Sequence, residues 1–128
     1  MYKKKRRRQK KKKYIKLNSV YVMCTSNNTK ITLTDPSGKP LGWSSGGSVG
    51  FKGSKRSTSY AAQLAAEVIG EKAYYLGIKN VRILFKGMGK GRFSVPKGLK
   101  SSGLKVRTII DNTPVPHNGC RPPKKRRV

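Results

Sequence analysis

The chain has 128 residues, and 31 Lys and Arg against 4 Asp and Glu give it a formal net charge of +27 at pH 7. This length allows one domain with a modest core, and so much positive charge destabilises a compact state by self-repulsion unless a polyanion is nearby. The composition therefore disfavours a free-standing cytosolic enzyme, two cysteines exclude a disulfide framework, and no apolar run approaches the roughly 18 residues of a membrane span.

Positive charge is concentrated near both ends of the chain. Residues 1–16 hold eleven Lys and Arg, residues 121–128 hold five, and neither segment has an acid. Such segments have too little apolar surface to offset the loss of chain entropy on folding. We therefore predict a core domain over 17–111, flanked by a basic arm over 1–16 and an extended Pro-rich basic tail over 112–128. The arm is expected to be disordered until it binds nucleic acid. The binding cations expected in the arm are Lys3, Lys4, Lys5, Arg6, Arg7, Arg8, Lys10, Lys11, Lys12 and Lys13.

The basic arm has two alternative interpretations. One is a nuclear localisation signal, which the segment 123–128 also resembles. The other is an organelle transit peptide, but transit peptides are amphipathic and rich in Arg and Ser, whereas this run has no Ser and no apolar face. We favour a nucleic-acid arm, and we expect no secretory signal because no apolar segment follows the charges.

Three strands are expected in the first part of the core. Residues 17–25 are apolar and β-branched, and residues 29–34 alternate, so the two segments predict a hairpin over the turn residues Asn27 and Asn28. Residues 40–45 predict a short third strand, and their Pro and Gly place it at an edge of the sheet.

A glycine-rich stretch over 46–58 leads into a helix. Thr58 or Ser59 is the expected N-cap, the helix extends to about Leu76, and Gly77 ends it. Several alanines allow this helix to approach a sheet closely. Apolar residues at nearly helical spacing predict its buried face, which comprises Tyr60, Ala61, Leu64, Ala65, Val68, Ala73 and Leu76.

The second part of the core repeats a strand, a glycine-rich loop and a helix. Residues 80–86 predict a strand and 87–92 a loop, followed by a short helix with Ser94 as N-cap and Pro96 in its first turn. Residues 104–110 predict the last strand. The order β-β-β-α-β-α-β predicts a single α/β domain with a mixed sheet of about five strands covered by helices. Its first three strands form an antiparallel meander, and the others pair in parallel through right-handed crossovers.

Both glycine-rich loops precede a helix, where backbone N–H groups and the positive helix end can hold phosphate. Small residues let a polyanion backbone approach, and the neighbouring cations neutralise it. The alternative is that the glycines only form turns and the cations are solvated. Two loops of the same design together with two basic ends favour phosphate binding. The expected binding residues are Lys52, Gly53, Ser54, Lys55, Arg56, Ser57 and Thr58 in the first loop, and Lys86, Gly87, Gly89, Lys90, Gly91 and Arg92 in the second.

Motifs for cofactor, metal or catalytic chemistry are incomplete. The G-x-G-x-G at 87–91 is not the dinucleotide fingerprint, and the chain has no G-x-x-x-x-G-K-[ST]. His117 and Cys120 have a metal-like spacing but supply half a zinc site, and Cys24 is expected to be a small core residue on a strand. A Cys–His nucleophile is disfavoured because nothing in a Pro-rich tail orients the imidazole. We expect no cofactor, no metal and no catalytic residue.

The tail over 112–128 contains four prolines, which keep it extended and reduce the entropy lost on docking. The residues expected to bind are His117, Asn118, Gly119, Arg121, Lys124, Lys125, Arg126 and Arg127. Asn118-Gly119 is also a pair in which isoaspartate can form, because Gly does not hinder backbone attack on the Asn side chain. Among aromatic residues, we expect Tyr21 and Trp43 in the core rather than as platforms for base stacking.

Taken together, these segments resemble the universal small-subunit ribosomal protein number eleven, of the bacterial and organellar type, over 17–128. The tail TPVPHNGCRPPKKRRV matches that family nearly letter for letter, and SNNTKITLTD, LGWSSGG, GFKGSKRST, AAQLAAE and KGMGKGR follow the family's order. The resemblance implies a structural ribosomal protein that binds small-subunit ribosomal RNA in the platform near the messenger exit and E site, and supports assembly and translation. It implies platform ribosomal proteins as neighbours, with messenger RNA near the exit, and RNA contacts at Asn27, Asn28, the two loops and the tail.

Several positions depart from that family. Met88 to Gly91 replace a Pro-Gly-Pro-Gly type loop, Phe93 replaces a common acid, and Ser59 stands where a proline often starts the helix. Pro96 and Gly98 weaken the second helix. The arm over 1–16 is more Lys-dense than in the family, so we expect it to reach RNA that other members do not contact. This drift favours a mitochondrial ribosome over a plastid or bacterial one.

Two functions from other classes are alternatives. A DNA-binding architectural protein would bind duplex DNA as well as structured RNA and would not sediment with ribosomal subunits. An RNase H-like nuclease fits a mixed sheet with crossover helices, but metal-dependent nucleases need clustered carboxylates, and the chain has only four acids, spread over turns and one helix.

Overall fold

The computed structural model describes residues 17–127, so the predicted basic arm over 1–16 lies outside the described residues. The elements are β1 (Asn18–Cys24), β2 (Thr29–Thr34), β3 (Pro40–Ser45), the 3-10 turn η1 (Gly53–Ser57), α1 (Ser59–Tyr75), β4 (Asn80–Lys86), the 3-10 turn η2 (Lys90–Phe93), α2 (Val95–Ser101) and β5 (Lys105–Asp111). This order confirms the predicted α/β fold, and the two 3-10 turns within the glycine-rich loops are additions to it.

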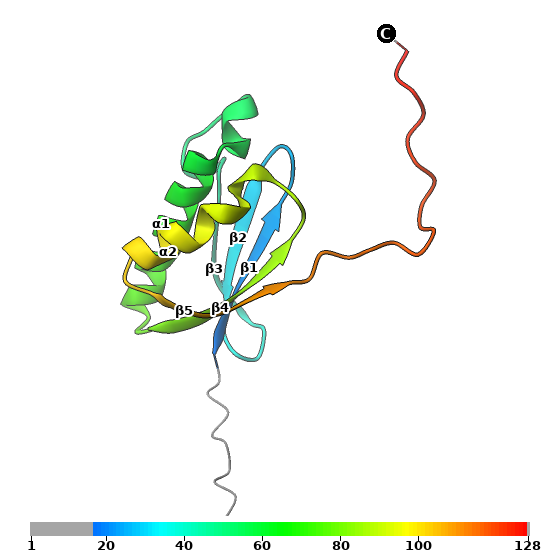
Figure 1. Cartoon of the computed structure of the whole chain (residues 1–128). Helices are drawn as coiled ribbons and strands as arrows, with labels where there is room; N and C mark the ends of the chain where they lie inside the picture. Colours follow the sequence, from blue (N-terminus) through cyan, green and yellow to red (C-terminus); the bar gives the residue numbers. More distant parts are fainter. Residues whose placement is uncertain (1–16, 128) are drawn as a thin grey trace, which may run out of the picture.

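The five strands form one mixed sheet in the order β3-β2-β1-β4-β5 (Figure 1). β1, β2 and β3 form the antiparallel meander, and β1 pairs in parallel with β4, which pairs in parallel with β5. β3 is an edge strand, as its Pro40 and Gly42 predicted. Because β1, β4 and β5 are parallel, Cys24, Lys86 and Asp111 end their strands at the same end of the sheet.

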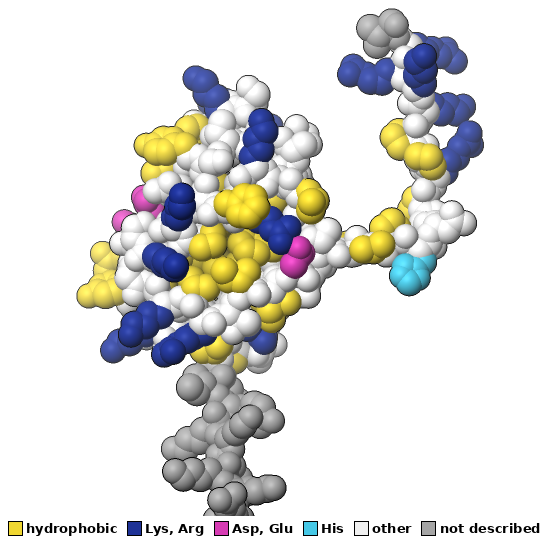
Figure 2. Space-filling model, viewed as in Figure 1, with side chains coloured by type: hydrophobic (Ala, Val, Ile, Leu, Met, Phe, Trp, Pro, Cys, Tyr) yellow, Lys and Arg dark blue, Asp and Glu magenta, His cyan; other side chains and the backbone are white. Residues whose placement is uncertain are grey.

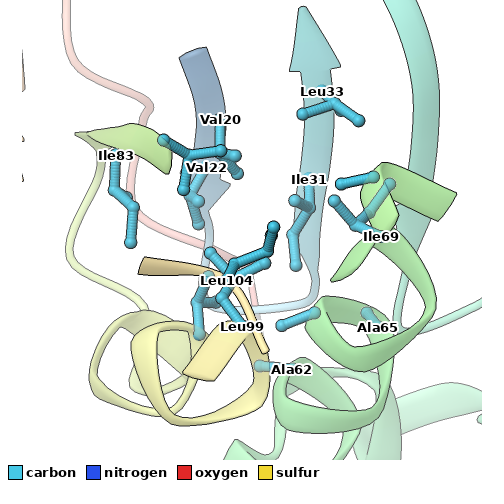
Figure 3. Packing of buried hydrophobic residues seen from close by; sticks show 14 of the residues in the cluster. Val20, Val22, Ile31, Leu33, Ala62, Ala65, Ile69, Ile83, Leu99 and Leu104 are labelled. Carbon is cyan, nitrogen blue, oxygen red and sulfur yellow. The ribbon is translucent and has the colours of Figure 1, made fainter. Parts of the chain in front are cut away.

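One face of the sheet carries both helices and the hydrophobic core (Figure 1). Strand residues alternate between the faces, so Val20 and Val22 of β1 and Ile31 of β2 point to the helices. Figure 3 shows Ile31 beside Ile69 of α1, and Leu99 of α2 belongs to the same cluster. Neither helix in residues 17–127 is long and apolar enough to cross a membrane.

The buried face of α1 differs from the predicted one. Tyr60, Val68 and Leu76 are 63%, 46% and 52% exposed, so their assignment to the core was wrong. Small residues let α1 lie close to both the sheet and α2. Because the helix contacts both neighbours, its buried face is the one that carries the small residues, and the larger apolar side chains lie outside that face. The buried residues of α1 are Ala61, Ala62, Ala65, Ala66, Ile69, Gly70 and Ala73.

The second helix forms in spite of Pro96 and Gly98. Pro96 lies in the first turn, where its missing N–H breaks no helical hydrogen bond. A Cβ atom on Gly98 would lie 2.6 Å from the carbonyl oxygen of Gln63 and 2.7 Å from Cβ of Ala66. Gly98 is therefore required for the close approach of α2 to α1, rather than being a weak point of the helix.

The other face of the sheet carries no helix within residues 17–127, and we call it the open face. Tyr21 and Trp43 lie there with 40% and 70% of their surface exposed, so their expected place in the core was wrong. The alternation along a strand explains this outcome, because burying Val20 and Val22 against the helices turns Tyr21 to the opposite face. Trp43 shares the face of Tyr21 through their common partner, Thr32.

Candidate nucleic-acid interface

Four connecting segments meet where β1, β4 and β5 end. They are the hairpin turn 25–28, the first glycine loop 46–58, the second glycine loop 87–93 and the tail root 111–113. We call this region the loop end. In open sheets with parallel strands, ligands bind at the carboxyl ends of the strands. The fold therefore brings together three of the segments for which binding was predicted from the sequence.

The hairpin turn is closed by Thr25 and Asn28. The backbone N–H of Thr25 donates to the carbonyl oxygen of Asn28 at 2.9 Å, and the Thr25 hydroxyl donates to the same oxygen at 3.0 Å. The side-chain oxygen of Asn28 accepts from the N–H of Thr29 at 2.8 Å. Asn28 is half-buried by these contacts, whereas Asn27 is exposed at the tip. Of the two predicted binding asparagines, Asn27 presents its side chain to solvent and Asn28 builds the turn.

The first glycine loop is held against the hairpin. A Cβ atom on the buried Gly46 would lie 2.5 Å from the carbonyl oxygen of Arg56 and 2.9 Å from the side-chain oxygen of Asn28. Gly50 and Gly53, in contrast, have φ of +100° and +59° and face open space. Glycine adopts such φ values more readily than residues with a side chain. One glycine thus packs the loop, while the other two let the chain turn at the surface.

The turn η1 presents cations in front of the α1 N-terminus. Lys52 and Lys55 are exposed, and Arg56 is half-buried with its Nε donating to the carbonyl oxygen of Gly53 at 3.4 Å. The Thr58 hydroxyl accepts from the N–H of Ala61 at 3.3 Å, which confirms Thr58 as the N-cap. The positive end of a 17-residue helix therefore faces the same region as these side chains.

The glycines of the second loop point into the protein and not toward solvent. A Cβ atom on Gly87 would clash with the carbonyl oxygen of Cys24, and one on Gly91 would clash with the hydroxyl of Thr29. On Gly89 it would lie 2.5 Å from the carbonyl oxygen of Thr25. These glycines let the loop lie against the end of β1 and the hairpin, which differs from the expected role of admitting a phosphate backbone. The exposed side chains of the loop are Met88, Lys90 and Phe93, and Lys86 is exposed directly before it.

The tail is fixed to the second loop at its root. Nη2 of Arg92 lies 2.6 Å from Oδ2 of Asp111, and the Arg92 guanidinium lies 5.3 Å from the ring centre of Phe85. Oδ1 of Asp111 accepts from the hydroxyl of Thr113 at 2.6 Å and from its N–H at 3.0 Å. The Thr113 oxygen in turn accepts from the N–H of Gly87 at 3.2 Å. We call this set of contacts the root clamp.

The root clamp changes the acidity of Asp111. The hydrogen bonds from Thr113, followed by the one from Arg92, stabilise the carboxylate and lower the pKa of Asp111 to about 2. Asp111 and Thr113 were not predicted to matter for the site. A local signal existed, because one of only four acids stands directly at the end of a strand and two residues before a Thr. The pairing with Arg92 is a contact across the fold and has no such signal.

Beyond the clamp the tail runs away from the domain as an extended segment (Figure 1). It changes direction near Asn118, which has φ of +59°. Figure 2 shows the His side chain at this bend and Lys and Arg along the far part of the tail. The predicted tail residues from His117 to Arg127 are all exposed. The structure therefore places them in one accessible segment that starts at the loop end.

Exposed cations at the loop end have few acidic neighbours. Within residues 17–127 the pair between Arg92 and Asp111 is the only ion pair. The exposed lysines at the loop end are Lys52, Lys55 and Lys90 in the two loops and Lys86 at the end of β4. They form no ion pair within the described part of the chain, and positive charge that is not neutralised attracts a polyanion.

The described residues hold no cluster of three or more His, Cys, Asp and Glu that could bind a metal ion. Cys24 is buried in β1, where burial raises the pKa of its thiol. Cys120 is exposed in the tail, as is His117. Cys24 is thus the small core residue that its place on a strand predicted.

The comparison with known families agrees with this architecture. A family model described as ribosomal protein S11 matches residues 18–127. The match includes the whole sheet, both helices, the loop end and the tail up to Arg127. It therefore covers well over half of the 128 residues. The chain belongs to the ribosomal protein S11 family.

Proposed function

We propose that this protein docks on small-subunit ribosomal RNA through its loop end while the tail threads between RNA segments. Membership of the family makes it a structural component of the small ribosomal subunit that binds ribosomal RNA, with other ribosomal proteins as partners. The observation that carries the proposal is the convergence of unpaired loop lysines at the point where a basic tail leaves the domain.

The mechanism is neutralisation of phosphates by a rigid platform and a preset tail. The clamp between Arg92, Asp111 and Thr113 fixes where the tail starts, and the packed glycines fix the second loop against the hairpin. Less conformational freedom then remains to be lost on docking. The prolines between 114 and 123 also reduce the conformational freedom that is lost on docking, because each limits the conformations of the free tail.

The place in the particle is part of the proposal. The order of motifs and the sequence of the tail support a bacterial or organellar type of protein in the platform near the messenger exit and E site. Messenger RNA near the exit is then a further neighbour. The Lys-dense arm over 1–16 and the drift in the second loop support a mitochondrial ribosome rather than a plastid or bacterial one. A role in assembly follows from a tail that bridges RNA segments.

The dependence of RNA binding on salt tests this proposal. Each phosphate neutralised contributes a slope of about −0.7 to −0.9 to log K against log salt concentration. A chain cut after Asp111 loses five cations, so its slope should be shallower by up to about 3.5–4.5. Replacing Lys52, Lys55 and Lys90 by Gln should reduce the slope by about 2–3 in the same way.

A matched control comes from the opposite end of the sheet, where Lys79, Lys105 and Arg107 are also exposed. Their replacement by Gln removes the same charge and should change the slope less than the loop variant does. Equal effects of the two triple variants would show that binding follows total charge, and a flat salt response of the wild type would contradict phosphate neutralisation altogether. In cells, the chain cut after Asp111 should fold but enter small subunits poorly.

A further inference from the structure

We propose that the open face of the sheet binds a single-stranded segment of RNA, with Tyr21 and Trp43 stacking on unpaired bases. The inference rests on the proposed function, because it names the kind of RNA that this second surface contacts. It extends the interface beyond the loop end to residues for which sequence patterns predicted a place in the core.

The strand register places the two aromatic residues in one row across the sheet. Tyr21 pairs with Thr32, and Thr32 pairs with Trp43, so the small Thr side chain separates the two rings. On the other side, Tyr21 pairs with Leu84 of β4. β1 and β3 lie roughly 10 Å apart with β2 between them. The row therefore offers two separate aromatic platforms, one for each of two bases, on a surface that no helix of residues 17–127 covers.

Cations lie next to this row. Met23 pairs with Lys30 on one side and with Lys86 on the other, so two exposed lysines flank the next row of the open face. A shallow cleft of about 220 Å³ runs between the rows and is lined by Tyr21, Val22, Met23, Lys30, Thr32, Leu84 and Lys86. Arg82 adds a third charge and donates from Nε to the hydroxyl of Ser19 at 2.8 Å.

This chemistry favours nucleic acid over an apolar protein segment. The strand residues on the open face include no Asp or Glu to pair with Lys30, Lys86 and Arg82. An apolar protein segment that packed on this face would remove lysine ammonium groups from water without neutralising them, which is costly. A nucleotide chain supplies a phosphate for each cation and a flat base for each ring. Single strands suit this face better than duplexes, because only unpaired bases expose their planes for stacking.

The open face also adjoins the loop end. Lys86 ends β4 on the open face and directly precedes the second glycine loop, so one RNA strand can pass from the loop cations to the aromatic row without leaving the protein surface. The exposure of Trp43 and Tyr21, 70% and 40%, leaves their ring surfaces accessible. The two contacts differ in kind, since the loop end contributes charge and the open face contributes stacking.

The chain's single tryptophan makes the proposal measurable in the full-length protein. We expect an oligouridylate of about 10 nucleotides to quench the fluorescence of Trp43, because stacking places a base against the indole. Tyr21→Ala should weaken binding of this probe roughly fivefold to hundredfold, and Trp43→Ala should do the same when binding is followed by anisotropy of the labelled probe. Trp43→Phe and Tyr21→Phe keep a ring and should retain most of the affinity.

The dependence of binding on salt concentration distinguishes stacking contacts from contacts between cations and phosphates. The alanine variants should bind more weakly at every salt concentration, with the slope of log K against log salt unchanged, because no phosphate contact is lost. Tyr75→Ala is the matched control, since Tyr75 is an aromatic residue with 87% exposure at the end of α1. It should bind the probe as the wild type does. Binding of the probe without quenching, or an equal loss in the Tyr75 variant, would overturn the proposal.

A crosslink in assembled particles identifies the occupant directly. With photoreactive benzoylphenylalanine in place of Trp43, irradiation of isolated small subunits should attach the chain to ribosomal RNA. Attachment to another ribosomal protein, or no attachment from a chain that has entered the subunit, would overturn the stacking proposal and leave the loop-end proposal standing. A chain that fails to enter small subunits contradicts the proposed function, and the oligouridylate measurement then decides the stacking proposal alone.

Discussion

Gly89 provides a sharp test of how the second loop is built. Its backbone has φ of −68° and ψ of 159°, values that alanine adopts without strain. The cost of Gly89→Ala is therefore steric only. The new Cβ would lie 2.5 Å from the carbonyl oxygen of Thr25 and 3.0 Å from Cβ of Cys24. Because neither atom is the free end of a flexible side chain, the loop itself has to move away from β1.

The magnitude follows from two opposing terms. Overpacking costs roughly 1–3 kcal/mol, and contact with a backbone carbonyl places Gly89→Ala in the upper half of that range. The lower entropy of the unfolded chain with Ala returns about 0.4–1 kcal/mol. The free energy of unfolding of Gly89→Ala is then lower by about 1–2 kcal/mol, which corresponds to a Tm lower by roughly 5–15 °C for a domain of this size.

Gly47 is the matched control in the first glycine loop. A Cβ atom there would meet Cδ of Arg56 at 3.5 Å, which is an ordinary contact, and Gly47 is exposed with no positive φ. Gly47→Ala should therefore raise the Tm by a few degrees through the unfolded-state term alone. Thermal unfolding of both full-length variants, followed by circular dichroism in salt that screens the positive charge, measures the difference. Equal stability of the two variants would refute the packing role of Gly89.

Three further predictions concern the clamp, the thiols and the core. Because the folded-state pKa of Asp111 is lowered from 3.8 to about 2, its stabilising effect is complete above about pH 4 and disappears as the pH falls toward 2. Asp111→Asn should therefore be less stable than the wild type at pH 7 and should lose less stability as the pH falls from 4 to 2. An acid titration of unfolding that is the same for both proteins would contradict the clamp. In the native protein Cys120 should react quickly with a thiol reagent, and Cys24 only after denaturant is added, so two fast thiols would show that Cys24 is not buried. Ile31→Ala should lower the free energy of unfolding by about 2–5 kcal/mol in denaturant titrations, and a loss below about 1 kcal/mol would place Ile31 outside a packed core.

Local signals in the sequence were sufficient for the order and bounds of most elements. The Thr58 cap and the Gly77 stop lie next to the residues that they affect, and Gly77 has φ of +75° as a helix-ending glycine requires. The edge position of β3 followed from Pro40 in the same way. These features depend on interactions between residues close in the chain, which a sequence displays directly.

Contacts between distant segments explain the predictions that were wrong. Tyr21 and Trp43 were assigned to the core by residue type, although the alternation around Val20 and Val22 already turned Tyr21 to the other face. The face of α1 could not be read from its own spacing, because α2 covers part of it. The need for glycine at position 91 likewise becomes visible only when the second loop is seen against the helix, because a Cβ atom there would lie 2.6 Å from Cβ of Ala62.

The candidate site residues show the same difference between local sequence signals and contacts across the fold. Charge runs and glycine-rich loops identified the segments that meet at the loop end, since their composition alone is unusual. Composition did not separate Asn27, which is exposed, from Asn28, which holds the hairpin. It also did not show that Arg92 forms an ion pair with Asp111 and so fixes the tail. Predicted binding residues thus include some whose contacts are within the protein.

Docking on ribosomal RNA is tested most directly by sedimentation of the full-length protein in native extracts at increasing salt. If the protein docks on ribosomal RNA, it should travel with the small ribosomal subunit and be released only at high salt, because many phosphate contacts must be broken together. A protein that stays at the top of the gradient, or that follows DNA, would contradict docking on ribosomal RNA and would favour a DNA-binding role.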